Sequence, residues 1–118
     1  MILSDLTNTL RDVYAADTSA DPAHWTPQNP TFGHCAVVAA IVQDHLGGTL
    51  LRTTVDEASH YFNRLPDGTE VDLTRDQFRV WSPTAVETRD REYVLSYPET
   101  ARRYRLLNDR VRSRGTQN

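Results

Sequence analysis

Cys35 is the only cysteine in the chain, and its surroundings predict a thiol nucleophile. A single cysteine cannot form an internal disulfide, so it is either a reactive thiol or a small buried apolar side chain. The residues from Gly33 to Leu46 are apolar almost all round and are followed by two glycines, which is typical of a buried helix. Cys35 would lie in the first turn of this helix, where unpaired N–H groups favour the reactive thiolate.

His60 is the base that we expect to take the proton of this thiol. The run Pro66-Asp67-Gly68 favours a three-residue hairpin loop, and this loop fixes how the two flanking strands pair. Counting back from the loop places His60 and Asp72 on one face as diagonal neighbours, roughly 7 Å apart at Cβ. Cys35, His60 and Asp72 then have the order of a nucleophile, a general base and an orienting acid. Asp72 could instead be only a structural partner for a half-buried His60.

Three amide side chains are further candidates near this triad. The Cys35 backbone N–H could donate to an oxyanion, and Gln28 or Asn29 could add a side-chain donor because both lie shortly before the cysteine. The hairpin pairing puts Asn63 on the face opposite His60. We therefore treat Asn63 as a reserve orienting residue that more readily satisfies backbone groups.

Aromatic residues flank the same segments. Trp25, Tyr61 and Trp81 could line a substrate pocket, although aromatic residues of this kind more often pack in a core. Trp25 also lies in a proline-rich loop that it could anchor. His34 precedes the nucleophile, and a helix turns its side chain about 100° away, so we expect a surface or capping role.

Composition narrows the classes of ligand. The formal net charge is −3 and all thirteen basic residues are arginines, so we expect neither nucleic acid nor a membrane as a partner. The N-terminus lacks a signal-peptide pattern, which favours a cytoplasmic location. No paired metal-ligand spacing such as Cys-x-x-Cys occurs, so we expect no metal and no cofactor. The oligomeric state is not readable from the sequence.

The length and element pattern predict one domain over residues 1–118. Its expected parts are a helix within 1–16 capped by Ser4, a core over 17–96 that carries the triad, a helix over 97–113 and a disordered tail over 114–118. Within the core we expect strands at 49–55 and on both sides of the hairpin loop, a capping box with a helical turn at 74–77, and irregular chain over 79–96.

Four segments together resemble the bacterial YunG-like family, and they cover roughly residues 24 to 80. They are the run from Trp25 to Ala39, Gly47-Gly48, the run from Ser59 to Asn63 and the run from Asp67 to Thr74. That family looks like a miniature of the transglutaminase-like and papain-like thiol enzymes. The resemblance implies an α+β fold in which the cysteine helix packs on a small antiparallel sheet between N- and C-terminal helices.

The resemblance implies Cys35 as nucleophile, His60 as general base and Asp72 as orienting acid. It implies acyl chemistry at an amide, ester or thioester, and this chain departs from the pattern by having His34 where we expect glutamine.

Our leading hypothesis is therefore a cysteine hydrolase or acyltransferase, acting on a small molecule or peptide that is free or attached to a carrier. The alternatives are a non-catalytic binding or regulatory module on the same scaffold, and an accessory protein that binds a partner through Arg102, Arg103 and Arg105.

Overall fold

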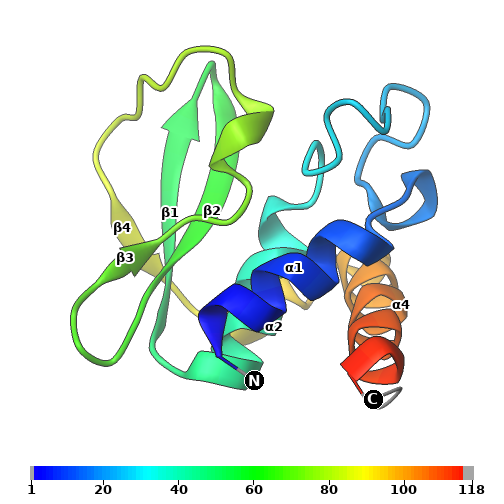
Figure 1. Ribbon diagram of the computed structural model, residues 1–118. Helices are drawn as coiled ribbons and strands as arrows, with labels where there is room; N and C mark the ends of the chain where they lie inside the picture. The colour runs from blue at the N-terminus through cyan, green and yellow to red at the C-terminus, as the bar shows by residue number, and fades with distance from the viewer. Residues whose placement is uncertain (1, 116–118) are drawn as a thin grey trace.

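A four-stranded antiparallel sheet lies on one side of the molecule and the long helices lie on the other, as Figure 1 shows. The computed structural model describes residues 2–115. The strands are β1 (Thr49–Val55), β2 (Ala58–Arg64), β3 (Glu70–Val71) and β4 (Glu87–Arg89), in the order β3-β2-β1-β4. The structure is thus of the α+β class, with the antiparallel sheet that the sequence predicts.

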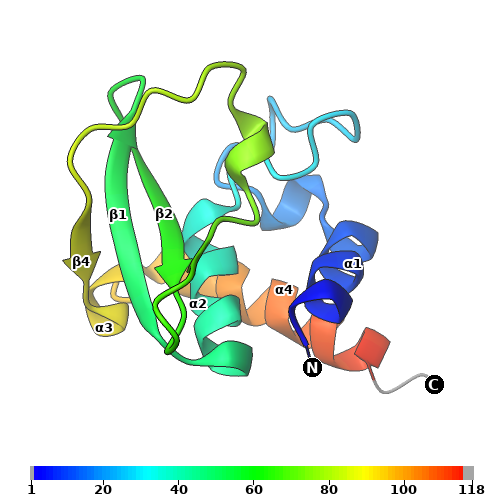
Figure 2. The same cartoon turned by 60° about the vertical axis from the view of Figure 1, so that its left-hand side comes forward.

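The central helix α2 (Cys35–Leu46) passes between the sheet and the other long helices (Figure 2). Its middle is buried on every side, which explains why apolar residues surround it rather than forming one stripe. Gly47 ends the helix with a φ of 75°, a left-handed conformation that glycine adopts without a steric penalty. Asn63 of β2 ties α2 to the sheet, because its Nδ2 donates to the Ala39 carbonyl at 2.9 Å.

Helices α1 (Leu3–Val13) and α4 (Pro98–Gly115) cover the side of α2 that faces away from the sheet. The main core lies between these three helices, and its fully buried members include Leu6, Leu10, Ile41, Leu107 and Val111. Each helix contributes residues three or four positions apart, so each presents one apolar stripe to the others.

The ends of these outer helices differ from the predicted ones. Helix α1 begins two residues earlier than a Ser4 cap predicts, because Ile2 occupies the N-cap, and it ends at Val13 rather than at residue 16. Helix α4 continues to Gly115, so the first two residues of the predicted tail are helical. Residues 116–118 of that tail lie outside the described residues.

The hairpin has the predicted register. Leu65 N–H donates to the Thr69 carbonyl at 2.8 Å, and Asn63 pairs with Val71. Gly68 closes the loop with a φ of 91°. A three-residue loop with a left-handed glycine therefore joins the strands, as expected from its sequence.

The segment after the hairpin contains more structure than the sequence indicated. The expected helical turn is present as η2 (Arg75–Gln77), but no capping box forms, because Gln77 Nε2 donates to the Thr74 carbonyl instead. Residues 79–96, predicted to be irregular, include β4 and the short helix α3 (Arg91–Val94). Strand β4 has no alternating apolar residues and exists through its pairing with β1, so its own sequence carries little signal.

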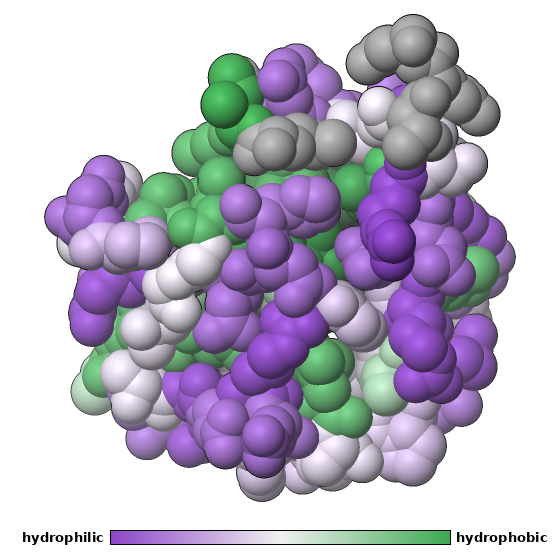
Figure 3. Space-filling model, turned by 90° about the horizontal axis from the view of Figure 1, so that it is seen from below, coloured by the Kyte–Doolittle hydropathy of each residue, from purple (hydrophilic) through white to green (hydrophobic). Residues whose placement is uncertain are grey.

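The loop between α1 and α2 is largely turns, with one short helix, η1 (Ala16–Thr18). Trp25 anchors this loop as expected, because its Nε1 donates to the Pro30 carbonyl at 2.9 Å. Hydrophilic residues make up much of the face seen in Figure 3, and apolar residues show between them in smaller groups. No helix within residues 2–115 is long and apolar enough to cross a membrane.

Candidate functional site

Cys35 is the first residue of α2 and lies beside strand β2. Its Sγ is 3.9 Å from the Ser59 carbonyl oxygen, and the side chain is partly exposed. The N–H of a residue at a helix start has no acceptor inside the helix, so the thiol lies at the positive end of α2. A reagent or substrate can therefore approach this sulfur from solvent.

His60 and Asp72 form the buried pair that the hairpin register predicts. His60 Nε2 is 2.7 Å from Asp72 Oδ2, and the imidazole is fully buried. The second carboxylate oxygen, Oδ1, accepts the Thr74 N–H at 3.2 Å. Both oxygens of Asp72 are thus engaged, which fixes the direction in which the carboxylate meets the ring.

Aromatic side chains surround the imidazole. Phe62 stacks on His60 with the ring centres 6.0 Å apart, and Phe78 and Trp81 meet it edge-on at 4.8 and 5.5 Å. These contacts hold the ring in one orientation and keep water away from it. Among apolar groups the charged form of an imidazole is stable only where polar partners compensate for the lost water.

The charge of His60 follows from this balance. Burial disfavours the imidazolium, but hydrogen bonding to Asp72 and Cys35, together with attraction to both groups, raises the pKa of His60 to about 9. Asp72 occupies Nε2, and Nδ1 is buried without a hydrogen bond of standard geometry to any described residue. Nδ1 is therefore the nitrogen left to exchange a proton with the Cys35 thiol.

The segment that leads into Cys35 is held from several directions. Ala20 N–H donates to the Gly33 carbonyl at 2.9 Å, and Gly33 N–H donates to Gln77 Oε1 at 3.3 Å. Ser19 Oγ donates to the Phe32 carbonyl at 2.9 Å. Gly33 has a φ of 76°, and a Cβ there would lie 2.2 Å from Ser19 Oγ, so only glycine fits. The start of α2 is therefore fixed before any ligand arrives.

His34 does not lie on the surface, which corrects one of the two predicted roles. It is the N-cap residue of α2, but its side chain is fully buried and makes no capping hydrogen bond. Its Nε2 is 2.7 Å from Thr18 Oγ1, its Nδ1 is 3.0 Å from the Phe32 carbonyl oxygen, and the ring packs on Tyr14. Burial lowers the pKa of His34 to about 4, so the ring is neutral near pH 7.

Arg103 is a residue of this region that we did not expect. The sequence groups Arg103 with Arg102 and Arg105 as residues that could bind a partner, but Arg103 is only 8% exposed. Its Nη1 is 3.4 Å from the Thr18 carbonyl oxygen and 3.5 Å from that of Gly33. The spacing of 103, 107 and 111 matches one helical stripe and could have revealed this burial, because Leu107 and Val111 are core residues.

The three predicted amide side chains have different surroundings. The Gln28 side chain is exposed, and within residues 2–115 neither Gln28 nor Asn29 makes a side-chain hydrogen bond. Asn63 faces α2 and not the imidazole, as its bond to Ala39 requires. An amide side chain that does meet the segment before Cys35 is that of Gln77, whose Oε1 accepts the Gly33 N–H.

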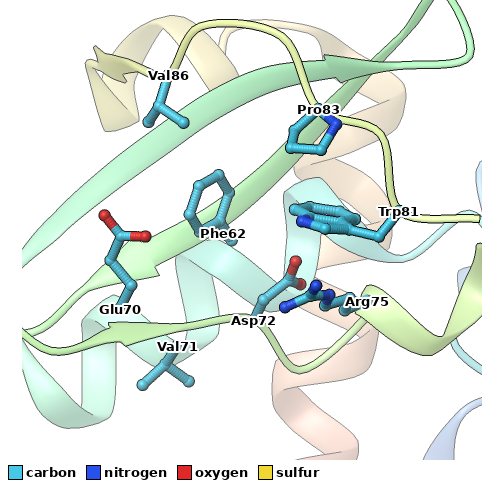
Figure 4. A pocket seen from close by; sticks show the side chains of 8 residues that line it. All are labelled: Phe62, Glu70, Val71, Asp72, Arg75, Trp81, Pro83 and Val86. Carbon is cyan, nitrogen blue, oxygen red and sulfur yellow. The ribbon is translucent and has the colours of Figure 1, made fainter.

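The three predicted pocket residues have different surroundings. Trp25 packs against the main core, and Tyr61 packs against the smaller cluster around Ala39 and Leu50. Trp81 lines a groove of about 280 Å³ (Figure 4). Other residues that line this groove are Phe62, Glu70, Val71, Asp72, Arg75, Pro83 and Val86. Trp81 thus borders a cavity that also touches the triad, at Asp72.

Within residues 2–115, no group of three or more histidine, cysteine or acidic side chains lies close enough together to hold a metal ion. The polar groups that converge are instead a thiol, an imidazole and a carboxylate. In chemical terms this set can move one proton along a line from sulfur to nitrogen, with the charge on nitrogen balanced by the carboxylate.

The fold and the site together define a small α+β protein with cysteine, histidine and aspartate gathered at the start of its central helix. The family model described as YunG protein matches residues 2–116, and the chain belongs to that family. A relative from Bacillus subtilis strain 168, described as "Uncharacterized protein YunG", is 44% identical over 55 residues. This match covers 47% of each chain, so it spans about half the length of the relative. No solved structure matches the chain.

Proposed function

We propose that this protein is a thiol-dependent enzyme that hydrolyses or transfers an acyl group, in the manner of the transglutaminase-like and papain-like enzymes. The observation that carries the proposal is the buried His60 imidazole, which Asp72 holds at 2.7 Å through Nε2 while Nδ1 makes no hydrogen bond to a described residue. The Cys35 sulfur lies 3.9 Å from the carbonyl oxygen of Ser59, the residue before this histidine. An inert buried cysteine needs neither a charged partner nor a position at a helix start.

In the proposed reaction the Cys35 thiolate attacks the carbonyl carbon of an amide, ester or thioester. The carbonyl π electrons move to oxygen, and the Cys35 N–H at the start of α2 donates to that oxyanion. When the intermediate collapses, the bond to the leaving group breaks and His60 Nδ1 gives its proton to that group. His60 is left neutral and its Nε2–H stays bonded to Asp72.

The second half of the reaction returns the enzyme to its starting state. Water or an amine attacks the thioester formed on Cys35, and His60 Nδ1 accepts the proton of this second nucleophile. Cys35 leaves as the thiolate, and the acyl group departs as an acid or as a new amide. Asp72 supports both halves because it favours the charged imidazole each time that the charge forms.

The substrate class that we propose is a small molecule or a peptide, free or attached to a carrier. Cys35 is partly exposed at the surface, so an acyl group on an extended arm can reach the sulfur without an opening of the core. The groove beside Asp72 has an apolar wall formed by Phe62, Trp81 and Pro83, which suits an apolar part of such a substrate.

The test is to incubate the protein with a panel of aryl esters, acyl thioesters and short peptide amides, and to follow product release and protein mass. We expect turnover with at least one ester or thioester and a transient acyl adduct on Cys35. Cys35→Ala should fold normally and lose both signals, and His60→Gln should lose most of the turnover. His24→Gln is a matched control, because His24 also pairs with an aspartate but its side chain is 77% exposed.

Turnover that persists in Cys35→Ala would contradict the proposal, because the reaction would then not pass through the thiol. Absence of any adduct across the panel, with tight non-covalent binding of the same compounds, would instead identify a binding module.

A further inference from the structure

Arg103 carries a buried positive charge that the proposed reaction leaves unused. Among the described residues, the groups to which its guanidinium bonds are all neutral, namely the Thr18 and Gly33 carbonyls and Thr100 Oγ1 at 3.3 Å. No carboxylate within residues 2–115 forms an ion pair with it. Arg102, its neighbour in sequence, is exposed and pairs with Glu99. A buried charge without a counter-ion destabilises the folded protein, so we expect a negatively charged group to act on Arg103.

The thiolate of Cys35 can supply this opposite charge, because Arg103 lies against the segment that leads into the cysteine. Gly33, whose carbonyl Arg103 contacts, is two residues before the cysteine. Burial lowers the pKa of Arg103, and the attraction of Cys35 is the strongest effect that opposes this fall. The other charges that act on it, Arg102 and Glu99, are of opposite sign to each other and lie on its own helix.

We propose that Arg103 is a positioning residue that holds the start of α2 in place and supplies the fixed positive charge that keeps Cys35 in its thiolate form. This inference rests on the proposed function, because it concerns the nucleophile of that reaction. The thiolate of the free enzyme is then supported by two cations, the imidazolium of His60 and the guanidinium of Arg103. His60 loses its positive charge when it gives up its proton, whereas Arg103 keeps its charge, since a guanidinium does not lose its proton in a protein.

Arg103 could act on Cys35 through its positive charge or through the hydrogen bonds that hold the start of α2, and two substitutions distinguish these roles. Arg103→Met keeps the length and removes the charge, and it should fold because an apolar side chain is well accepted in a buried site. Arg103→Lys keeps the charge but loses the second guanidinium nitrogen, Nη2, which bonds to Thr100 Oγ1. If the charge matters, lysine restores the reactivity of Cys35 and methionine does not.

The experiment measures the rate of iodoacetamide alkylation by protein mass from about pH 5 to about pH 10, for the full chain. Cys35 is the only cysteine, so each alkylation reports on it. We expect Arg103→Met to react about tenfold more slowly than the wild type near pH 6 and equally fast near pH 10, where every thiol is ionised. Arg103→Lys should follow the wild-type profile within about twofold, and Arg102→Met, the exposed control, should not differ.

An unchanged profile in Arg103→Met, or a lysine variant as slow as the methionine variant, would overturn the role in charge. His60→Gln separates this failure from failure of the proposed function. If His60→Gln shifts the profile while Arg103→Met does not, only the role of Arg103 falls. If neither variant shifts it, Cys35 has no activating partner and the proposed function falls as well.

Discussion

Asp72→Asn removes the charge that faces His60 while it keeps the size of the side chain and one acceptor oxygen. The pKa of His60 is about 9 in the folded protein, against 6.5 for an ordinary histidine. One pH unit corresponds to about 1.4 kcal/mol. The raised pKa, which combines the effects of burial, Asp72 and Cys35, therefore adds on the order of 3 kcal/mol to the free energy of unfolding when His60 is charged in both states. Asp72 is the first of the groups that raise the value.

The sign of the pH dependence follows from the direction of the change. The folded pKa lies above the unfolded one, so the stabilisation is fully present below about pH 6.5 and is lost as the pH rises through about 9. In Asp72→Asn the buried imidazole has lost its carboxylate, and burial then lowers the pKa of His60. This variant should be less stable than the wild type near pH 6, and the difference should shrink toward pH 10.

The assay is urea unfolding followed by tryptophan fluorescence at about pH 6, 7.5 and 9.5. Trp81 touches the His60 ring edge-on, so one of the two tryptophans reports on the site itself. Asp21→Asn is the control, because Asp21 pairs with His24 at 2.9 Å but on the surface, where such pairs contribute little. A destabilisation by Asp72→Asn that is the same at all three pH values would refute this prediction, because the stabilising effect of the carboxylate would then not depend on the charge of His60.

Three further predictions concern the framework of the site. Asn63→Ala should lower the free energy of unfolding by roughly 1 to 3 kcal/mol in urea titrations, because the Ala39 carbonyl loses its buried donor. A loss below 0.5 kcal/mol, by the same order-of-magnitude scale, would contradict this. Gly33→Ala should cost roughly 1 to 3 kcal/mol and slow Cys35 alkylation, since its Cβ would collide with Ser19 Oγ; unchanged stability and rate would show that the loop adapts. His34 should show no NMR titration between about pH 5 and 8, and a titration midpoint near 6.5 would contradict the burial of its ring. The protein should also lose stability as the pH falls from about 6.5 toward 4, because over this range the unfolded chain binds a proton at His34 that the folded chain does not.

The hairpin shows which features of the site a sequence can predict. The loop Pro66-Asp67-Gly68 sets the strand pairing by its own backbone geometry, so the approach of His60 to Asp72 followed from local residues alone. The position of Cys35 was readable for a similar reason, since apolar residues on every side and two closing glycines define a buried helix and its start.

The surroundings of the triad could not be predicted from the sequence in this way, because they depend on contacts between distant segments. His34 is buried because Thr18 and Tyr14 lie against it, and nothing in its immediate sequence requires that packing. Arg103 is buried because α4 passes beside the loop that leads into α2. Histidine and arginine side chains are usually exposed to solvent, but contacts with distant segments bury both of these.

The amide donors illustrate the same limit. Gln28 and Asn29 are candidates because they are close to Cys35 in the sequence, but within residues 2–115 neither makes a side-chain hydrogen bond. Gln77 reaches that segment from a part of the chain more than forty residues away. Closeness in sequence is therefore a weak guide to side-chain contacts across a turn.

The central claim is that Cys35 and His60 form a thiolate and imidazolium pair, and ultraviolet absorbance of the thiolate tests it most directly. The measurement compares the absorbance near 240 nm of the wild type and of Cys35→Ser as the pH rises from about 5 to about 10. The account predicts a difference signal that is already present near pH 6 and disappears at that pH in His60→Gln. A signal that emerges only near pH 8.5, as for a free thiol, and is the same in both proteins would contradict it.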